Sequence, residues 1–246
     1  ANARARLRRA EHAVASGRAQ GAVHEIGGPP TTAGLVDIAG AAGTLPTLAI
    51  AGGRSFAGQF DPESSPSDST GAIGPTRYVQ LVNSRFGIYN RTSNGPVGTG
   101  TLNALAGVNA SVSAFDPQVI WDASTNRFYY AMDLVFSDTD NRVAFGFSKT
   151  SAPTTAADWC KYYIAYHDEF PDYPKLGDAQ GFLAIGVNVF EGGEDGNFLR
   201  ADALWVKKPG TGSLTSCPSA ASLRAGVQQD LRDAFGQQVL APTPAN

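Results

Sequence analysis

The sequence predicts an all-β protein, specifically a β-propeller built from four-stranded antiparallel blades. Three observations predict this: short runs of branched and aromatic residues, turn residues between the runs, and many glycines and prolines. The 246-residue chain has 28 Gly, 15 Pro and only 17% charged residues, a mixture typical of short strands joined by tight turns. About three blades are expected, which make only part of a ring because a propeller has at least four.

The clearest blade lies in residues 114–166. Val, Ile, Tyr and Phe fill its runs, since these side chains fit a pleated, half-buried surface. Turn-forming residues at 122–126 and 138–141 separate them. The four expected strands are Gln118–Trp121, Arg127–Leu134, Arg142–Ser148 and Lys161–Tyr166.

Hairpins flank this blade on both sides and predict the other two blades. The earlier hairpin pairs Tyr78–Val82 with Phe86–Tyr89, and the later one pairs Phe182–Val189 with Ala203–Val206. Each of these runs is mostly apolar, as expected of strands buried on one or both faces.

The chain divides into three zones. Residues 61–218 contain the predicted blades. Residues 1–60 are expected to form a helix followed by an irregular, extended N-terminal segment. Residues 219–246 are expected to form a short amphipathic helix and a linker to a further blade, because Leu223, Val227, Leu231 and Phe235 follow helical spacing.

The two cysteines, Cys160 and Cys217, favour one disulfide. Neither lies in a CxxC motif, so a zinc site is not expected. A disulfide indicates an oxidising compartment, hence an extracellular or cell-surface location. The alternative is two unrelated buried thiols.

Charge and hydropathy exclude two classes of partner. The net charge is −3 without long runs of one sign, which gives no footprint for nucleic acid. No apolar run approaches the roughly 20 residues of a membrane span.

Three acidic residues, Asp68, Asp116 and Asp178, each precede or begin an apolar run. In a propeller the innermost strands line a central channel, so these residues are expected to meet at its mouth. There they would form a binding site for Ca²⁺, which prefers oxygen ligands, or an acid/base pair. The alternative is that each caps a turn through hydrogen bonds to nearby backbone amides.

Two acidic loops are further candidates for calcium. One contains Asp138, Asp140 and Asn141, and the other contains Glu194, Asp195 and Asn197. Neither has the full twelve-residue calcium loop with its terminal glutamate. Plain hairpin turns are the alternative for both.

Catalytic motifs are lacking in the sequence, which favours a non-catalytic protein. No serine lies in a GxSxG context, and no sialidase-type Ser-x-Asp-x-Gly-x-Thr-Trp turn occurs. Glycoside hydrolysis by paired carboxylates stays open, because the distance between carboxylates is invisible in a sequence.

Several motifs together resemble a family of secreted bacterial β-propeller proteins, whose members are loosely described as sialidase-like or as cell-surface repeat proteins. The motifs are Ser67–Tyr89, Asp116–Asp122, Asn126–Phe128 and Tyr173–Asp178, and the resemblance covers about residues 56–208. It implies a propeller, an exported location and further blades after Asn246. It implies no catalytic residues.

We therefore expect a secreted or cell-surface propeller that acts as a binding or assembly module. Its expected partners are another protein, further copies of itself or a glycan. One alternative is a carbohydrate-active, sialidase-like hydrolase with a carboxylate site at the channel mouth. Another is a subunit of an extracellular polymer.

Overall fold

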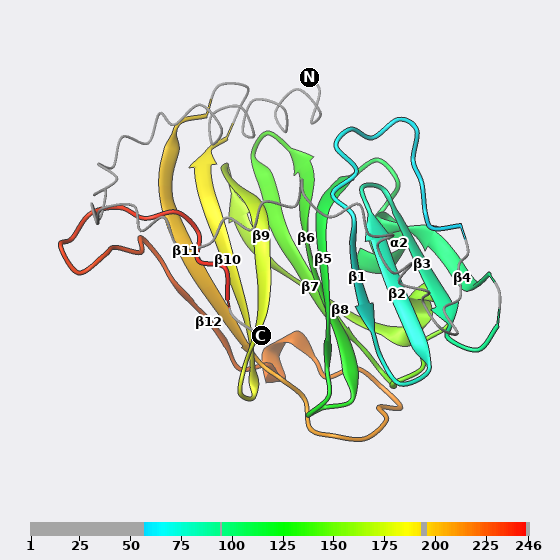
Figure 1. Cartoon of the computed structure of the whole chain (residues 1–246). Helices are drawn as coiled ribbons and strands as arrows, with labels where there is room; N and C mark the ends of the chain where they lie inside the picture. Colours follow the sequence, from blue (N-terminus) through cyan, green and yellow to red (C-terminus); the bar gives the residue numbers. More distant parts are fainter. Residues whose placement is uncertain (1–56, 94, 193–195, 245–246) are drawn as a thin grey trace, which may run out of the picture.

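The computed structural model describes residues 57–93, 95–192 and 196–244. The described chain forms three four-stranded antiparallel sheets that stand side by side (Figure 1). Each sheet uses four strands that are consecutive in the sequence. The all-β prediction is confirmed, whereas the expected helix near the N-terminus lies outside the described residues.

The first sheet is followed in the sequence by a short helix that contacts both the first and the second sheet. Its strands are β1 (Thr70–Ile73), β2 (Arg77–Val82), β3 (Arg85–Asn90) and β4 (Pro96–Thr101). Helix α2 (Leu102–Ala106) begins where the Thr101 side chain accepts a hydrogen bond from the Ala104 N–H, and it ends at Gly107. Gly107 has φ of 75°, a left-handed conformation that glycine adopts without steric cost.

The second sheet contains the four strands predicted for residues 114–166, each longer than expected. They are β5 (Ser113–Asp122), β6 (Arg127–Ser137), β7 (Asp140–Ser148) and β8 (Trp159–His167). A two-residue turn at 138–139 joins β6 to β7.

The third sheet corrects the prediction for the C-terminal zone. Its strands are β9 (Glu169–Ala179), β10 (Phe182–Glu191), β11 (Phe198–Lys207) and β12 (Ala225–Gln228). Where an amphipathic helix was expected, the chain makes one 3₁₀ turn at Ala220–Ser222 and then pairs β12 with β11. The helix predicted from the spacing of Leu223 and Val227 is wrong, because hydrogen bonding to the free edge of β11 determines the local structure.

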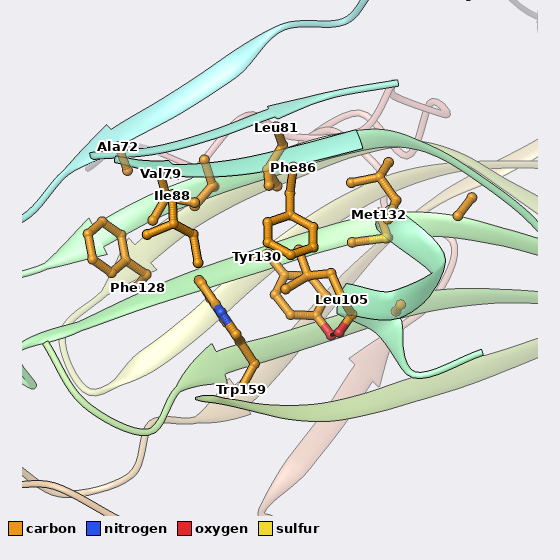
Figure 2. Close-up of a cluster of buried hydrophobic side chains, with 14 of the residues drawn as sticks. Ala72, Val79, Leu81, Phe86, Ile88, Leu105, Phe128, Tyr130, Met132 and Trp159 are labelled. Atoms are coloured by element: carbon orange, nitrogen blue, oxygen red, sulfur yellow. Dashed lines mark hydrogen bonds between the residues drawn. The ribbon is translucent and has the colours of Figure 1, made fainter. Parts of the chain in front are cut away.

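The second sheet is buried on both faces, so its strands lose the alternation of a half-exposed sheet. One face contributes Phe128, Tyr130 and Met132 to an apolar cluster shared with the first sheet and α2 (Figure 2). The other face contributes Tyr129 and Phe145 to a cluster shared with the third sheet. All nine residues from Arg127 to Val135 are buried. Burial on both faces holds the three sheets together.

Cys160 and Cys217 form a disulfide, with 5.4 Å between their Cα atoms. It joins the start of strand β8 to the connection between β11 and β12. The bond therefore ties the second sheet to the third. Within the described ranges, no helix has both the length and the apolar character needed to cross a bilayer.

Replacing Cys217, which is exposed, by serine tests the contribution of this crosslink. The bond closes a loop with a sequence separation of 57, for which the chain-entropy relation gives a loss of about 4 kcal/mol in the free energy of unfolding. Urea unfolding measures the loss. The wild type should become equally unstable in reductant, whereas Cys217→Ser should be indifferent to reductant. Equal stability of both proteins without reductant would contradict the prediction.

Candidate functional site

The first strand of each sheet contains, or closely follows, a non-glycine residue with positive φ. These first strands are β1, β5 and β9, with β5 lying between the other two (Figure 1). In β5 the pairing jumps from Phe115 opposite Asp133 to Gln118 opposite Ala131. Asp116, in that jump, has φ of 51°, and Asp68 and Tyr173 have φ of 42° and 52° before or within β1 and β9. Such bulges re-aim the backbone and side chains of a strand.

The bulges connect neighbouring sheets through one type of hydrogen bond, which we call the inter-sheet link. In the first link, the Asp116 backbone N–H donates to Asn83 Oδ1 of the first sheet, with an N–O distance of 2.8 Å. In the second, the Tyr173 N–H donates to Asp133 Oδ2 of the second sheet at 3.1 Å. Asp133 lies opposite Phe115 at the start of the β5 bulge, and the Asn83 backbone N–H donates to the Ser67 carbonyl oxygen, next to Asp68.

A third link of the same kind joins the third sheet to the C-terminal segment. The Ala241 N–H donates to Asn188 Oδ1 at 2.8 Å. Asn188 pairs with Asp172 beside the β9 bulge, as Asp133 pairs with Phe115 beside the β5 bulge. The donors Asp116, Tyr173 and Ala241 are all followed by proline.

The second link belongs to a cluster of buried carboxylates, which we call the carboxylate cluster. It consists of Asp116 on β5, Asp133 on β6 and Asp172 on β9, exposed by 2%, 1% and 4%. One oxygen from each lies within 4.8 Å of the others. In the described part of the chain, this is the group of acidic, His or Cys residues whose geometry suits a metal ion.

Burial dominates the electrostatics of the cluster. It raises the pKa of Asp133 well above its ordinary value, and the negative charges of Asp116 and Asp172 add to the rise. Lys175 lies nearby, over the ring of Tyr173. Burial lowers the pKa of Lys175, while the surrounding carboxylates oppose that effect.

This arrangement suits the retention of a proton or a cation better than the handling of a substrate. The three carboxylates are enclosed between sheets, so a polymeric or sugar substrate has no route to them. Carboxylate oxygens are hard ligands suited to Ca²⁺. The cluster contains no nitrogen or sulfur ligand of the kind that zinc sites use.

Asp68, Asp116 and Asp178 were predicted to lie at one site, and this prediction is wrong for Asp178. Asp178 lies six residues beyond Asp172 on β9, which is about 20 Å along an extended strand. There it pairs with Lys208, whose Nζ also lies 3.0 Å from Asp122 Oδ2. The side chains of Lys208 and Asp122 are almost wholly buried, so this is a structural ion pair between the second and third sheets.

Asp68 lies closer to its expected position, although outside the carboxylate cluster. Its carboxylate accepts a hydrogen bond from the Asn83 side chain, which also donates to the Pro66 carbonyl oxygen at 3.0 Å. Asp68 thus fixes the side chain that accepts the first inter-sheet link. Its negative charge also acts on Lys175.

The two acidic loops have structural contacts where they are described. Asp140 forms two hydrogen bonds of 2.7 Å with Arg142, and the Asn141 side chain donates to the His167 carbonyl oxygen. Asp138 lies in the turn between β6 and β7. Asn197 donates to Glu191 Oε2 at 2.9 Å, whereas Glu194 and Asp195 lie outside the described residues.

The site residues predicted from the sequence did not include Asp133, Asp172 and Lys175. A signal for Asp133 was present, because it is the one charged residue within the apolar run Phe128–Val135, and a buried charge requires compensation. Asp172 had no such signal, since it lies in a polar stretch that resembles a loop.

Acid titration tests the buried ion pair at the opposite end of the strands. Burial opposes ionisation of Asp122, but hydrogen bonds from Thr125, Ser124 and Lys208 outweigh it and lower its pKa. A lowered folded-state pKa gives stability that is full above the unfolded value of about 4 and is lost as the pH falls further. Asp122→Asn should therefore cost about 3 kcal/mol of unfolding free energy at pH 7 and fall less steeply below pH 4.

Urea unfolding at pH 2–7 provides the measurement. Asp230→Asn is the matched control, since Asp230 pairs with Arg232 on the surface and should change stability by less than about 1 kcal/mol. Parallel pH profiles for Asp122→Asn and the wild type would refute this account of Asp122.

Comparison with known proteins adds no assignment to this geometry. No protein-family model, curated protein or solved structure matches the chain.

Proposed function

We propose that this chain is a non-catalytic, β-propeller-type module of an exported protein, and that it works by binding and assembly. The observation that carries the proposal is the third inter-sheet link. It gives residues around Ala241 the same relation to the third sheet that β5 has to the first and β9 has to the second. The outward face of the third sheet is thereby prepared for a further sheet.

Close backbone contacts support this role of the C-terminal segment. Pro242 lies against Gly186 on β10, and Pro244 lies against Gly177 on β9. A Cβ atom at either glycine would clash with these prolines, and glycine often marks such close approaches of another backbone. The segment therefore crosses the same pair of strands, first and second, that an innermost strand contacts in the preceding sheets.

The assembly partner that fits this face is a set of antiparallel strands that pair with the segment 240–244. In each sheet of this chain, the innermost strand pairs with the strand that follows it in sequence. Continuation by the same polypeptide would extend the row of sheets toward a ring. A partner protein or a second copy would do so by adding strands to the exposed edge.

The contacts of charged side chains favour assembly over hydrolysis. Arg127 is fully buried and donates to the Ser148 carbonyl oxygen at 2.8 Å. Arg142 pairs with Asp140, and Arg200 pairs with Glu169 and Asp202. A sialidase-like site needs several arginines that converge on a substrate carboxylate, whereas Arg142 and Arg200 pair with carboxylates of their own sheets.

The disulfide supports export. A crosslink between Cys160 and Cys217 persists in oxidising compartments and is rare where thiols are kept reduced. The sequence resemblance to secreted propellers supports the same location.

Hydrogen exchange at the Ala241 amide tests the role of the third link. The wild type should protect this amide at least about tenfold more than Asn188→Ala, because the variant lacks the acceptor. Asn188→Asp is the matched control, since a carboxylate accepts the equivalent bond at Asp133. Exchange at the random-coil rate in the wild type would overturn the proposal.

Assembly itself is tested with the polypeptide purified from its natural source. The amide of Thr243 should exchange slowly there and quickly in the isolated 246-residue chain. Protection that rises with the concentration of the isolated chain would instead identify a second copy as the partner. Equal, fast exchange in both proteins at all concentrations would refute assembly through this face.

Glycoside turnover tests the hydrolase alternative. Fluorogenic sialosides and aryl glycosides should give no turnover above buffer. Turnover that Asp116→Asn abolishes, with folding retained by circular dichroism, would replace the present proposal with a catalytic one.

A further inference from the structure

The carboxylate cluster poses a charge problem that the fold alone does not solve. Asp116, Asp133 and Asp172 come from three strands of two sheets and are all more than nine-tenths buried. An ionised carboxylate is costly to remove from water unless it is paired or coordinates a metal. Three of them within 4.8 Å also repel one another.

The hydrogen bonding of Asp133 shows that the cluster is incomplete with the protein groups alone. Its Oδ2 accepts the inter-sheet link from the Tyr173 N–H. Its Oδ1 is buried, and no donor among the described residues hydrogen-bonds to it. A buried acceptor without a partner destabilises a fold unless something else satisfies it.

Comparison of the three links shows that the extra oxygen is not needed for the link. Asn83 and Asn188 accept the equivalent hydrogen bonds through an amide oxygen, at 2.8 Å in both cases. An asparagine at position 133 would satisfy the Tyr173 N–H equally well and would carry no charge. The carboxylate at this one link therefore has a second role.

We propose that Asp116, Asp133 and Asp172 together bind a calcium ion between the second and third sheets. Calcium ligands lie 2.3–2.6 Å from the ion, so two ligand oxygens on one ion are at most about 5 Å apart. The spacing within the carboxylate cluster satisfies this limit. Backbone carbonyl groups and water would complete the six to eight oxygen ligands.

Lys175 is the protein's own competitor for this position. Its ammonium group lies close enough for Asp116, Asp172 and Asp133 to act on it, and it sits over the Tyr173 ring. A lysine that only partly offsets three carboxylates leaves net negative charge for a divalent cation. Removal of the Lys175 charge should therefore tighten calcium binding.

Calcium titration of the chelator-treated chain tests the proposal by two readouts. Thermal unfolding should shift upward by about 5–10 °C when calcium is 100-fold above its dissociation constant. Terbium, a luminescent calcium substitute excited through nearby aromatic rings, should bind and be displaced by calcium. Magnesium at the same concentration should give less than half of the thermal shift.

Three variants locate the ion. Asp133→Asn should weaken calcium binding at least tenfold, yet its calcium-free form should unfold no lower than the calcium-free wild type, because repulsion is relieved and the link is kept. Lys175→Met should bind calcium several-fold more tightly. Asp230→Asn, which removes an equal charge from the surface pair with Arg232, should respond as the wild type does.

The following results would overturn the proposal. A wild type that neither responds to calcium up to 10 mM nor binds terbium would show that the cluster holds a shared proton or is neutralised by Lys175. An Asp133→Asn variant that responds to calcium as strongly as the wild type would place the ion elsewhere. If Asp133→Asn does not fold, Lys175→Met decides the matter, since unchanged or weaker calcium binding in that variant would contradict the assignment.

Discussion

The inter-sheet link is the interaction on which the arrangement of the three sheets depends. Apolar burial supplies most of the favourable free energy, but it has no direction. The second sheet is apolar on both faces, so apolar burial alone is compatible with several positions of the neighbouring sheets. A hydrogen bond from a bulge N–H to one side chain of the preceding sheet selects a single position, because a shift of one residue along the strand would turn each side chain to the opposite face.

The same geometry explains why polar groups lie deep in an otherwise apolar interior. A bulge leaves a backbone N–H outside the ladder of its own sheet, and a buried N–H needs an acceptor. Asn83, Asp133 and Asn188 supply acceptors without interrupting the apolar clusters on either side. Among the described residues, the carboxylate cluster lies at the middle link, where Asp116 and Asp172 lie close to Asp133. The charge at that link is thus an addition to a fold whose other links function with amides.

The sequence predicted the sheets better than the site because strands depend on local patterns. Branched and aromatic residues predict strands in runs such as Arg127–Leu134 and Phe182–Val189. The disulfide was predicted because the chain has only two cysteines. Strand β12 escaped prediction because its formation depends on the edge of β11, which is distant in sequence. The sequence could not predict that Asp133 lies close to Asp172, since the β5 and β9 bulges bring the two residues together across two sheets.

The assignment of Asp178 to a repeated acidic position failed for a more general reason. Residues that occupy the link position are Asp116, Tyr173 and Ala241, which share no side-chain chemistry. The link uses only their backbone N–H, so it is compatible with any of these side chains, and the shared feature is the proline that follows. A repeat of this kind is visible in the register of the strands and not in the type of residue. Asp178 recurs at a spacing similar to that of the repeat, although it belongs to a separate ion pair with Lys208 at the far end of the strands.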